Sequence, residues 1–183
     1  MDRSAFRVVI IGAGPGGIVA AKRLLEEGFS NHEVIEASDA VGGTWNLNRY
    51  PGCECDVPSV MYSFSFAFKA DWSKPYGRQP EIRAYMQDVA EEYGVTPHCR
   101  FGDAVSSIEW NELDSCWHIT TESGRETSAN AVISAVGMLN QPVFPDIAGL
   151  ESFGGPMFHS ARWEDSVSLT GARVAVIGSA ASA

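Results

Sequence analysis

The feature that most constrains the fold is the opening run FRVVIIGAGPGG, residues 6–17. Residues 8–11 are apolar and mostly β-branched, which is typical of a strand buried on both faces of a parallel sheet. Gly12, Gly14 and Gly17 follow directly, and the apolar-periodic run IVAAKRLLEEG comes next. A strand, a GxGxxG turn and a helix in this order predict the dinucleotide-binding unit of an α/β, Rossmann-like fold.

Each glycine of this turn has a separate task. Gly12 permits the tight turn, Gly14 lets a pyrophosphate approach the backbone, and Gly17 lets the helix pack closely on the strand. Pro15 and Gly16 lie in the same turn, where the N–H groups that begin a helix attract phosphate. We therefore expect these five residues to bind the pyrophosphate of a dinucleotide.

A second predicted strand, residues 33–36, ends in the carboxylate of Glu36. Glu36 lies 24 positions after Gly12, about the separation expected of an acid that accepts hydrogen bonds from ribose hydroxyls. A carboxylate would repel a 2′-phosphate, so this site favours FAD or NAD over NADP.

Composition excludes several classes of protein. The chain has 183 residues, with 45% hydrophobic and 20% charged residues, as in soluble globular domains. A net charge of −10 argues against nucleic-acid binding, and no apolar run reaches the ~20 residues of a membrane helix. A signal peptide is disfavoured because four glycines and a proline interrupt the first apolar stretch. The four cysteines form no CxxC pair, so we expect free thiols in a reducing cytoplasm and no metal site.

A long non-periodic segment, residues 41–66, follows the second strand, and such loops are usually functional. Gly42 and Gly43 allow the backbone to lie against a flat ligand, and Trp45 and Tyr62 offer aromatic surface. Core packing explains the two aromatic residues equally well, and a turn-capping role explains Asp56 equally well.

Two groups of residues carry a resemblance to a known family, the type I Baeyer–Villiger monooxygenases, which are FAD- and NADPH-dependent flavoproteins. The first group resembles the pattern [A/G]GxW…[F/Y]PG…D and comprises Gly42, Gly43, Thr44, Trp45, Tyr50, Pro51, Gly52 and Asp56. The second resembles the family fingerprint FxGxxxHxxxW and comprises Phe153, Gly155, His159 and Trp163. Departures from the family pattern occur at Glu164, Ala180 and Ala183.

The resemblance implies an FAD-binding domain over residues 1–150, a linker that carries the fingerprint over 151–170, and the truncated start of an NADP-binding Rossmann domain over 171–183. It implies insertion of one oxygen atom from O2 beside a ketone carbonyl to give an ester or lactone. Asp56 would be the catalytic residue and would pair with an arginine beyond residue 183, so we expect the chain alone to be inactive. The cofactor-binding residues implied beyond the opening turn and Glu36 are Gly43, Thr44, Trp45, Asn46, Leu47, Cys55, Asp56, Tyr62, Val105 and Gly178.

Two alternatives stay open: a flavin monooxygenase that oxidises nitrogen or sulfur, and a non-catalytic FAD-binding module. Trp163 favours the Baeyer–Villiger resemblance over the first. Neither the ketone nor the oligomeric state is indicated by the sequence.

The rest of the chain predicts further elements. A helix is expected over residues 80–94, with Ile82, Tyr85, Met86, Val89 and Tyr93 on its apolar stripe. Strands are expected over 105–110, 117–121, 127–134 and, before Gly178, over 174–177. Residues 135–137 resemble the turn that returns the chain past the cofactor in such flavoproteins. His159 is expected to hold two domains in register rather than transfer protons. His32, His98 and His118 are expected at the surface or in loops.

Overall fold

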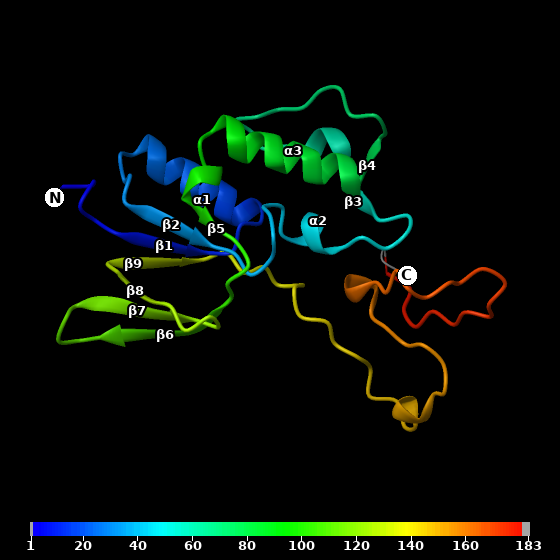
Figure 1. Cartoon of the computed structure of the whole chain (residues 1–183). Helices are drawn as coiled ribbons and strands as arrows, with labels where there is room; N and C mark the ends of the chain where they lie inside the picture. Colours follow the sequence, from blue (N-terminus) through cyan, green and yellow to red (C-terminus); the bar gives the residue numbers. More distant parts are fainter. Residues whose placement is uncertain (1, 181–183) are drawn as a thin grey trace.

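A four-stranded parallel sheet forms the centre of the computed structural model, which describes residues 2–180 (Figure 1). Its strands, in spatial order, are β5 (Cys99–Arg100), β2 (His32–Ile35), β1 (Val8–Ile11) and β9 (Ala131–Ser134). All three pairings are parallel. β1 is fully buried, as its continuous apolar run predicts for a central strand. The predicted Rossmann-like α/β class is confirmed.

Two helices cover one face of this sheet, α1 (Pro15–Glu26) and α3 (Gln79–Glu92) (Figure 1). Ile10 and Val34 share a core cluster with Ile18 of α1 and with the buried stripe of α3. Four of the five predicted stripe residues of α3 are buried, and Gly94 follows the helix at a φ of +69°. The predicted helix is therefore confirmed within two residues at its end.

A three-stranded antiparallel sheet packs on the other face, with β6 (Val105–Asn111), β7 (Cys116–Thr121) and β8 (Glu126–Ala129) in that order. Val9, Ile11 and Ile35 point toward it and share a second core cluster with Ile119 and Ala129. The alternation of β1 between the two clusters follows from the period of two in a strand.

The predicted strand over residues 127–134 is wrong as a single element. It divides at Asn130 into β8 and β9, which belong to different sheets. The Asn130 side-chain oxygen accepts a hydrogen bond from the Arg7 N–H at 2.8 Å, and the Asn130 N–H donates to the Arg7 carbonyl at 2.9 Å. The change of sheet is set by these contacts with a segment far away in sequence.

The segment over residues 41–66 is less irregular than expected. It contains α2 (Thr44–Leu47), β3 (Glu54–Pro58) and the 3-10 turn η1 (Ser59–Met61). β3 pairs antiparallel with β4 (Tyr76–Arg78), and a further 3-10 turn, η2 (Thr96–His98), precedes β5. Elements of three to five residues are too short to produce a detectable periodicity.

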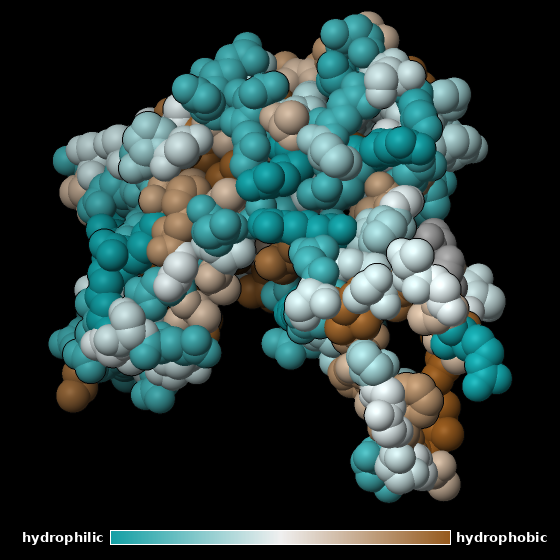
Figure 2. All heavy atoms as spheres, turned by 45° about the vertical axis from the view of Figure 1, so that its right-hand side comes forward, coloured by the Kyte–Doolittle hydropathy of each residue, from teal (hydrophilic) through white to brown (hydrophobic). Residues whose placement is uncertain are grey.

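The segment after residue 134 leaves the body of the molecule (Figures 1 and 2). Within residues 135–180 the regular elements are two 3-10 turns, η3 (Leu150–Ser152) and η4 (Ser160–Arg162). The predicted strand over 174–177 is wrong, because Val174, Val176 and Ile177 are exposed and in irregular backbone. A strand needs a hydrogen-bonded neighbour, and the described part of the chain provides none there. No helix within residues 2–180 is long and apolar enough to cross a membrane.

Candidate functional site

The opening turn has the backbone geometry that its glycines predict. Gly12 has a φ of +99°, and a Cβ there would lie 2.6 Å from the Ala135 carbonyl oxygen. A Cβ on Gly17 would overlap the Gly12 carbonyl oxygen. Gly14 caps α1 without a side-chain hydrogen bond, so the first N–H groups of the helix remain as donors for a ligand. The chain also returns past this turn at Ala135, as residues 135–137 predict.

The second predicted segment lies directly against this turn. A Cβ on Gly43 would lie 2.8 Å from the Gly14 Cα, and one on Gly14 would lie 3.5 Å from the Gly43 Cα. The Gly42 N–H donates to the Ala13 carbonyl at 3.0 Å. The two segments that the sequence assigns to one cofactor are therefore side by side.

Glu36 connects the end of β2 to the same turn. Its side chain is buried, one carboxylate oxygen accepts the Ala13 N–H at 2.7 Å, and the other accepts the Ser38 N–H at 2.8 Å. Each carboxylate oxygen has a second lone pair, so both can still accept a hydroxyl donor. This places a carboxylate at the carboxyl ends of β1 and β2, where α/β sheets bind ligands.

Trp45 and Tyr62 are brought together. The indole N–H of Trp45 donates to the Tyr62 hydroxyl at 2.8 Å, and their rings meet edge to face with centroids 5.6 Å apart. Burial raises the pKa of the Tyr62 hydroxyl. Trp45 belongs to the core cluster and Tyr62 packs against it, so both residues do have the packing role that the sequence left as an alternative.

Asn46 lies beside them on α2 and is completely buried. Its amide nitrogen donates to the Ser38 hydroxyl at 3.2 Å and to a carboxylate oxygen of Asp39 at 3.0 Å. Its side-chain oxygen has no partner within residues 2–180. A buried acceptor without a donor is costly, so Asn46 has capacity for a hydrogen-bonding ligand. Thr44 and Leu47, also on α2, are exposed and half-buried respectively.

Cys55 and Asp56 are neighbours on β3 and face opposite ways. Cys55 is buried, and burial raises the pKa of its thiol. Asp56 is exposed, because alternate residues of a strand face opposite sides. No ion pair links Asp56 to another of the described residues. All four cysteines are free, as predicted.

The remaining predicted residues belong to other elements of the fold. Val105 begins β6 and packs against the second core cluster. Gly178 is exposed in the C-terminal segment. The fingerprint residues make local contacts: His159 Nδ1 accepts the Ala161 N–H at 3.1 Å, and Trp163 meets Phe158 with ring centroids 5.1 Å apart. Phe153 is exposed, and a Cβ on Gly155 would lie 2.9 Å from its ring. Ala180 lies at the end of the described chain, and Ala183 lies outside it.

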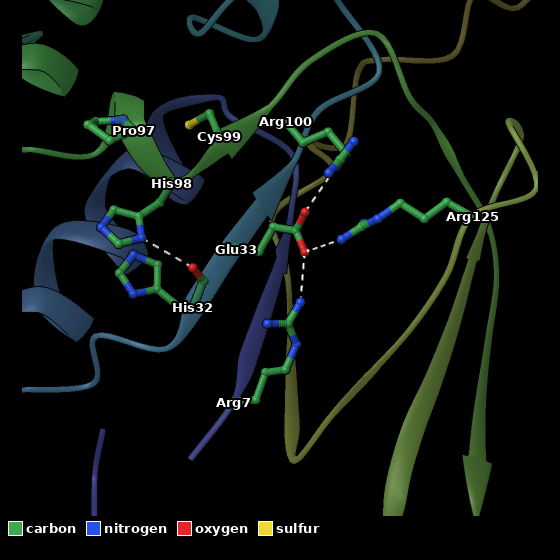
Figure 3. Close-up of a pocket in the computed structure, with 8 residues that line it drawn as sticks. All are labelled: Arg7, His32, Glu33, Pro97, His98, Cys99, Arg100 and Arg125. Atoms are coloured by element: carbon green, nitrogen blue, oxygen red, sulfur yellow. Dashed lines mark hydrogen bonds and ion pairs between the residues drawn. The ribbon is translucent and has the colours of Figure 1, made fainter. Parts of the chain in front are cut away.

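A polar pocket of about 580 Å³ contains none of the predicted site residues (Figure 3). Three guanidinium groups converge on the Glu33 carboxylate, from Arg7 at 2.9 Å, Arg100 at 3.1 Å and Arg125 at 2.9 Å. Burial acts to raise the pKa of Glu33, but the hydrogen bonds from Arg125 and Arg100 outweigh it and the pKa is lowered. This network ties the antiparallel sheet to the parallel one, and no sequence pattern indicates it because its members are far apart in the chain.

The same pocket corrects the placement of His32, whereas half-buried His98 ends the 3-10 turn η2, in agreement with its expected place at the surface or in a loop. His32 is buried on β2, and its ring stacks on that of His98 with centroids 4.1 Å apart. Burial lowers the pKa of His32. The His98 ring nitrogen Nδ1 donates to the His32 carbonyl at 3.2 Å. Exposed His118 follows the prediction.

A parallel sheet with a glycine turn before α1 and a buried acid after β2 defines a dinucleotide-binding domain of the Rossmann type. The family described as pyridine nucleotide-disulphide oxidoreductase matches residues 9–183. The chain belongs to this family.

Individual relatives belong to a narrower class of enzyme than the family description gives. A Baeyer–Villiger monooxygenase of Streptomyces coelicolor is 49% identical over 177 residues, which are 97% of this chain and 34% of that protein. A Baeyer–Villiger monooxygenase of Pseudomonas aeruginosa is 44% identical, with the same two coverages of 97% and 34%. The chain therefore spans about a third of the length of these relatives.

Solved structures agree. An open crystal structure of cyclohexanone monooxygenase superposes with a TM-score of 0.80 at 36% identity, over 90% of this chain and 34% of that one. Oxidised steroid monooxygenase bound to NADP gives 0.76 at 38% identity, over 87% and 31%. The resemblance drawn from the two motif groups is confirmed.

Proposed function

We propose that this chain forms the FAD-binding part of a Baeyer–Villiger monooxygenase that uses NADPH and O2 to convert a ketone into an ester or lactone. The observation that carries the proposal is the contact between Gly14 and Gly43, which joins the dinucleotide turn to the segment that carries the family pattern. The similarity to cyclohexanone monooxygenase and to Baeyer–Villiger monooxygenases supports the reaction class.

The residues present fit FAD. The start of α1 offers N–H donors for a pyrophosphate, Glu36 keeps acceptor capacity for ribose hydroxyls, and the orphaned side-chain oxygen of Asn46 can accept a donor. Solved relatives are described as complexes with FAD and NADP. We propose that the opening turn, Glu36 and residues 43–47 hold FAD, with Cys55, Asp56, Tyr62 and Val105 as further contacts.

When bound, FAD supplies the redox chemistry with O2, and NADPH supplies the electrons. The chain itself would orient the bound groups and shield them from water. The hydrogen bond between Trp45 and Tyr62 fixes two aromatic rings beside the glycine segment, where they exclude water from the site. Asp56 presents an exposed carboxylate on β3, and we propose that it receives an arginine from a part of the enzyme beyond residue 183.

The domain boundaries are part of the proposal. The last strand of the parallel sheet ends at Ser134, and the exposed apolar residues of 136–177 are consistent with a linker over 151–170 and an NADP-binding domain that begins near residue 171. Gly178 would then belong to the second dinucleotide turn, and Phe153, Gly155, His159 and Trp163 would set the relation between the domains. A reducing, cytoplasmic location is supported by four free thiols.

A visible absorption spectrum after incubation with FAD and gel filtration tests the proposal. We expect about one equivalent of flavin on the chain, loss of flavin from Gly14→Val, and retention by Gly154→Val, whose added side chain meets no atom within 4 Å of the Cβ. A chain that retains no flavin would refute the FAD assignment, and flavin on Gly14→Val would refute the pyrophosphate site.

A second candidate, a non-catalytic FAD-binding module, is favoured by the exposure of Asp56 and its lack of an ion pair with the described residues. The distinction requires the full-length enzyme. NADPH consumption coupled to ketone oxidation supports the first proposal, and turnover of amines or sulfides with ketones inert would indicate a nitrogen- or sulfur-oxidising enzyme instead.

A further inference from the structure

Three potential metal ligands of different chemical types converge at the turn between β6 and β7. They are a carboxylate oxygen of Asp114, the thiol of Cys116 and a ring nitrogen of His118, and these ligand atoms all lie within 4.8 Å of one another. The Asp114 carboxylate is 3.4 Å from His118 Nε2. Figure 1 shows this turn at the end of the molecule opposite α2, far from the proposed FAD contacts.

The hairpin geometry explains the convergence. Cys116 and His118 are two residues apart on β7, so their side chains point to the same face. Ser115 has a φ of +50° and is the one residue other than glycine with a positive φ among those described; it turns the chain so that Asp114 lies over that face. The Asn111 side chain holds Asp114 in place. Its amide nitrogen donates to the Asp114 carboxylate at 2.9 Å, and its oxygen accepts the Asp114 backbone N–H at 3.2 Å.

A surface ion pair accounts for only part of this arrangement. An exposed pair between Asp114 and His118 contributes little to stability and gives no reason for a thiol to lie within reach of both. Cys116 is half-buried and free, whereas Asp114 and His118 are exposed. The three ligand atoms, which lie within 4.8 Å of one another, need only small side-chain adjustments to meet at one ion.

We propose that Asp114, Cys116 and His118 bind a zinc-class divalent ion, with water at a fourth position. Thiolate, imidazole and carboxylate are the ligands that Zn²⁺ prefers, and four-coordinate sites are usual for it. On binding, the Cys116 thiol loses its proton to the solvent and the thiolate becomes the ligand. The ion closes the hairpin and thereby stabilises the outer antiparallel sheet. This proposal departs from the expectation of no metal site, which rests on the absence of a CxxC pair.

Cobalt and zinc titrations of the purified, fully reduced chain test this proposal. We expect one equivalent of Co²⁺ to produce a thiolate-to-metal charge-transfer band with tetrahedral d–d bands, and Zn²⁺ to displace it. Cys116→Ser should remove the charge-transfer band, and His118→Gln should weaken Zn²⁺ binding at least about tenfold, since even losing a residue that supports a metal ligand costs that much. Glu112→Gln changes an acid of the same turn outside the cluster and should bind normally.

Two results would overturn the site. One is the absence of stoichiometric Co²⁺ and Zn²⁺ binding by the unaltered chain. The other is an unchanged charge-transfer band in Cys116→Ser, which would place the metal on Cys53, Cys55 or Cys99. Far-ultraviolet circular dichroism of each variant separates lost binding from lost folding, and His118→Gln keeps the proposal testable if Cys116→Ser does not fold.

Discussion

Gly43→Ala should both destabilise the fold and weaken FAD binding. Gly43 has a φ of +53° and a ψ of −120°, a conformation that costs an alanine about 1–3 kcal/mol. Its Cβ would also lie 2.8 Å from the Gly14 Cα. The atom that the Cβ would meet belongs to the backbone and cannot rotate away. The loop must therefore move away from the turn, at an overpacking cost of about 1–3 kcal/mol. The two effects together give roughly 2–6 kcal/mol.

Gly52→Ala is the matched control. Gly52 also has a positive φ, +80°, but a Cβ there meets no atom within 4 Å, so it tests backbone strain without the contact. Any gain from a less flexible unfolded chain is shared by both variants. Urea unfolding should therefore show Gly43→Ala about 1–3 kcal/mol less stable than the control. Each kcal/mol corresponds to about 2–4 °C in Tm for a chain of this size.

Flavin fluorescence titration completes the experiment. Displacing the loop from Gly14 should raise the Kd for FAD at least about tenfold, equivalent to ~1.4 kcal/mol, while the Gly52→Ala control retains its affinity. Equal FAD affinities in the two variants would show that the contact between the segments does not shape the cofactor site. Equal stabilities would show that the loop is free to move.

Three further outcomes are expected. Glu36→Ala should weaken FAD binding by roughly 1.5–3 kcal/mol for each lost charge-assisted hydrogen bond; an unchanged Kd means that the ribose is held elsewhere. Glu33 has a lowered pKa in the fold, so its contribution to stability exists above the pKa of the unfolded chain and is lost as the pH falls through the folded value. Acid unfolding monitored by circular dichroism should be less pH-dependent in Glu33→Gln, and identical profiles would contradict this. The FAD-loaded chain should not couple NADPH consumption to ketone turnover, which product analysis checks; coupled turnover would show that no further arginine is needed.

The first half of the fold follows from local sequence because local constraints are strong there. The apolar run of residues 8–11 predicts a buried strand, and the structure has one there. The turn that follows requires glycine, since a Cβ at Gly12 or Gly17 meets backbone atoms. Helix α3 is predicted equally well, by its apolar stripe and by the glycine that follows it.

The rest depends on contacts between distant segments. Asn130 divides a predicted strand through hydrogen bonds with Arg7, and Glu33 collects arginines from three separate parts of the chain. The residues at 174–177 have strand composition but no strand, because composition supplies propensity and a neighbouring strand supplies hydrogen bonds. Asp56 is similar: its chemistry is visible in the sequence, but its exposure is set by the alternation of β3.

The contact between Gly14 and Gly43 gives the family pattern a second physical cause. Each glycine is usually explained by the approach of a cofactor to the backbone. Here, however, a Cβ on Gly43 conflicts with the Gly14 backbone of the protein itself. Gly43 is therefore required by the fold of the protein itself, as well as by any flavin. A substitution at Gly43 should therefore alter stability and FAD binding together. The same holds for Glu36→Ala, because the buried Glu36 carboxylate accepts the Ala13 and Ser38 N–H groups as well as keeping acceptor capacity for a ligand.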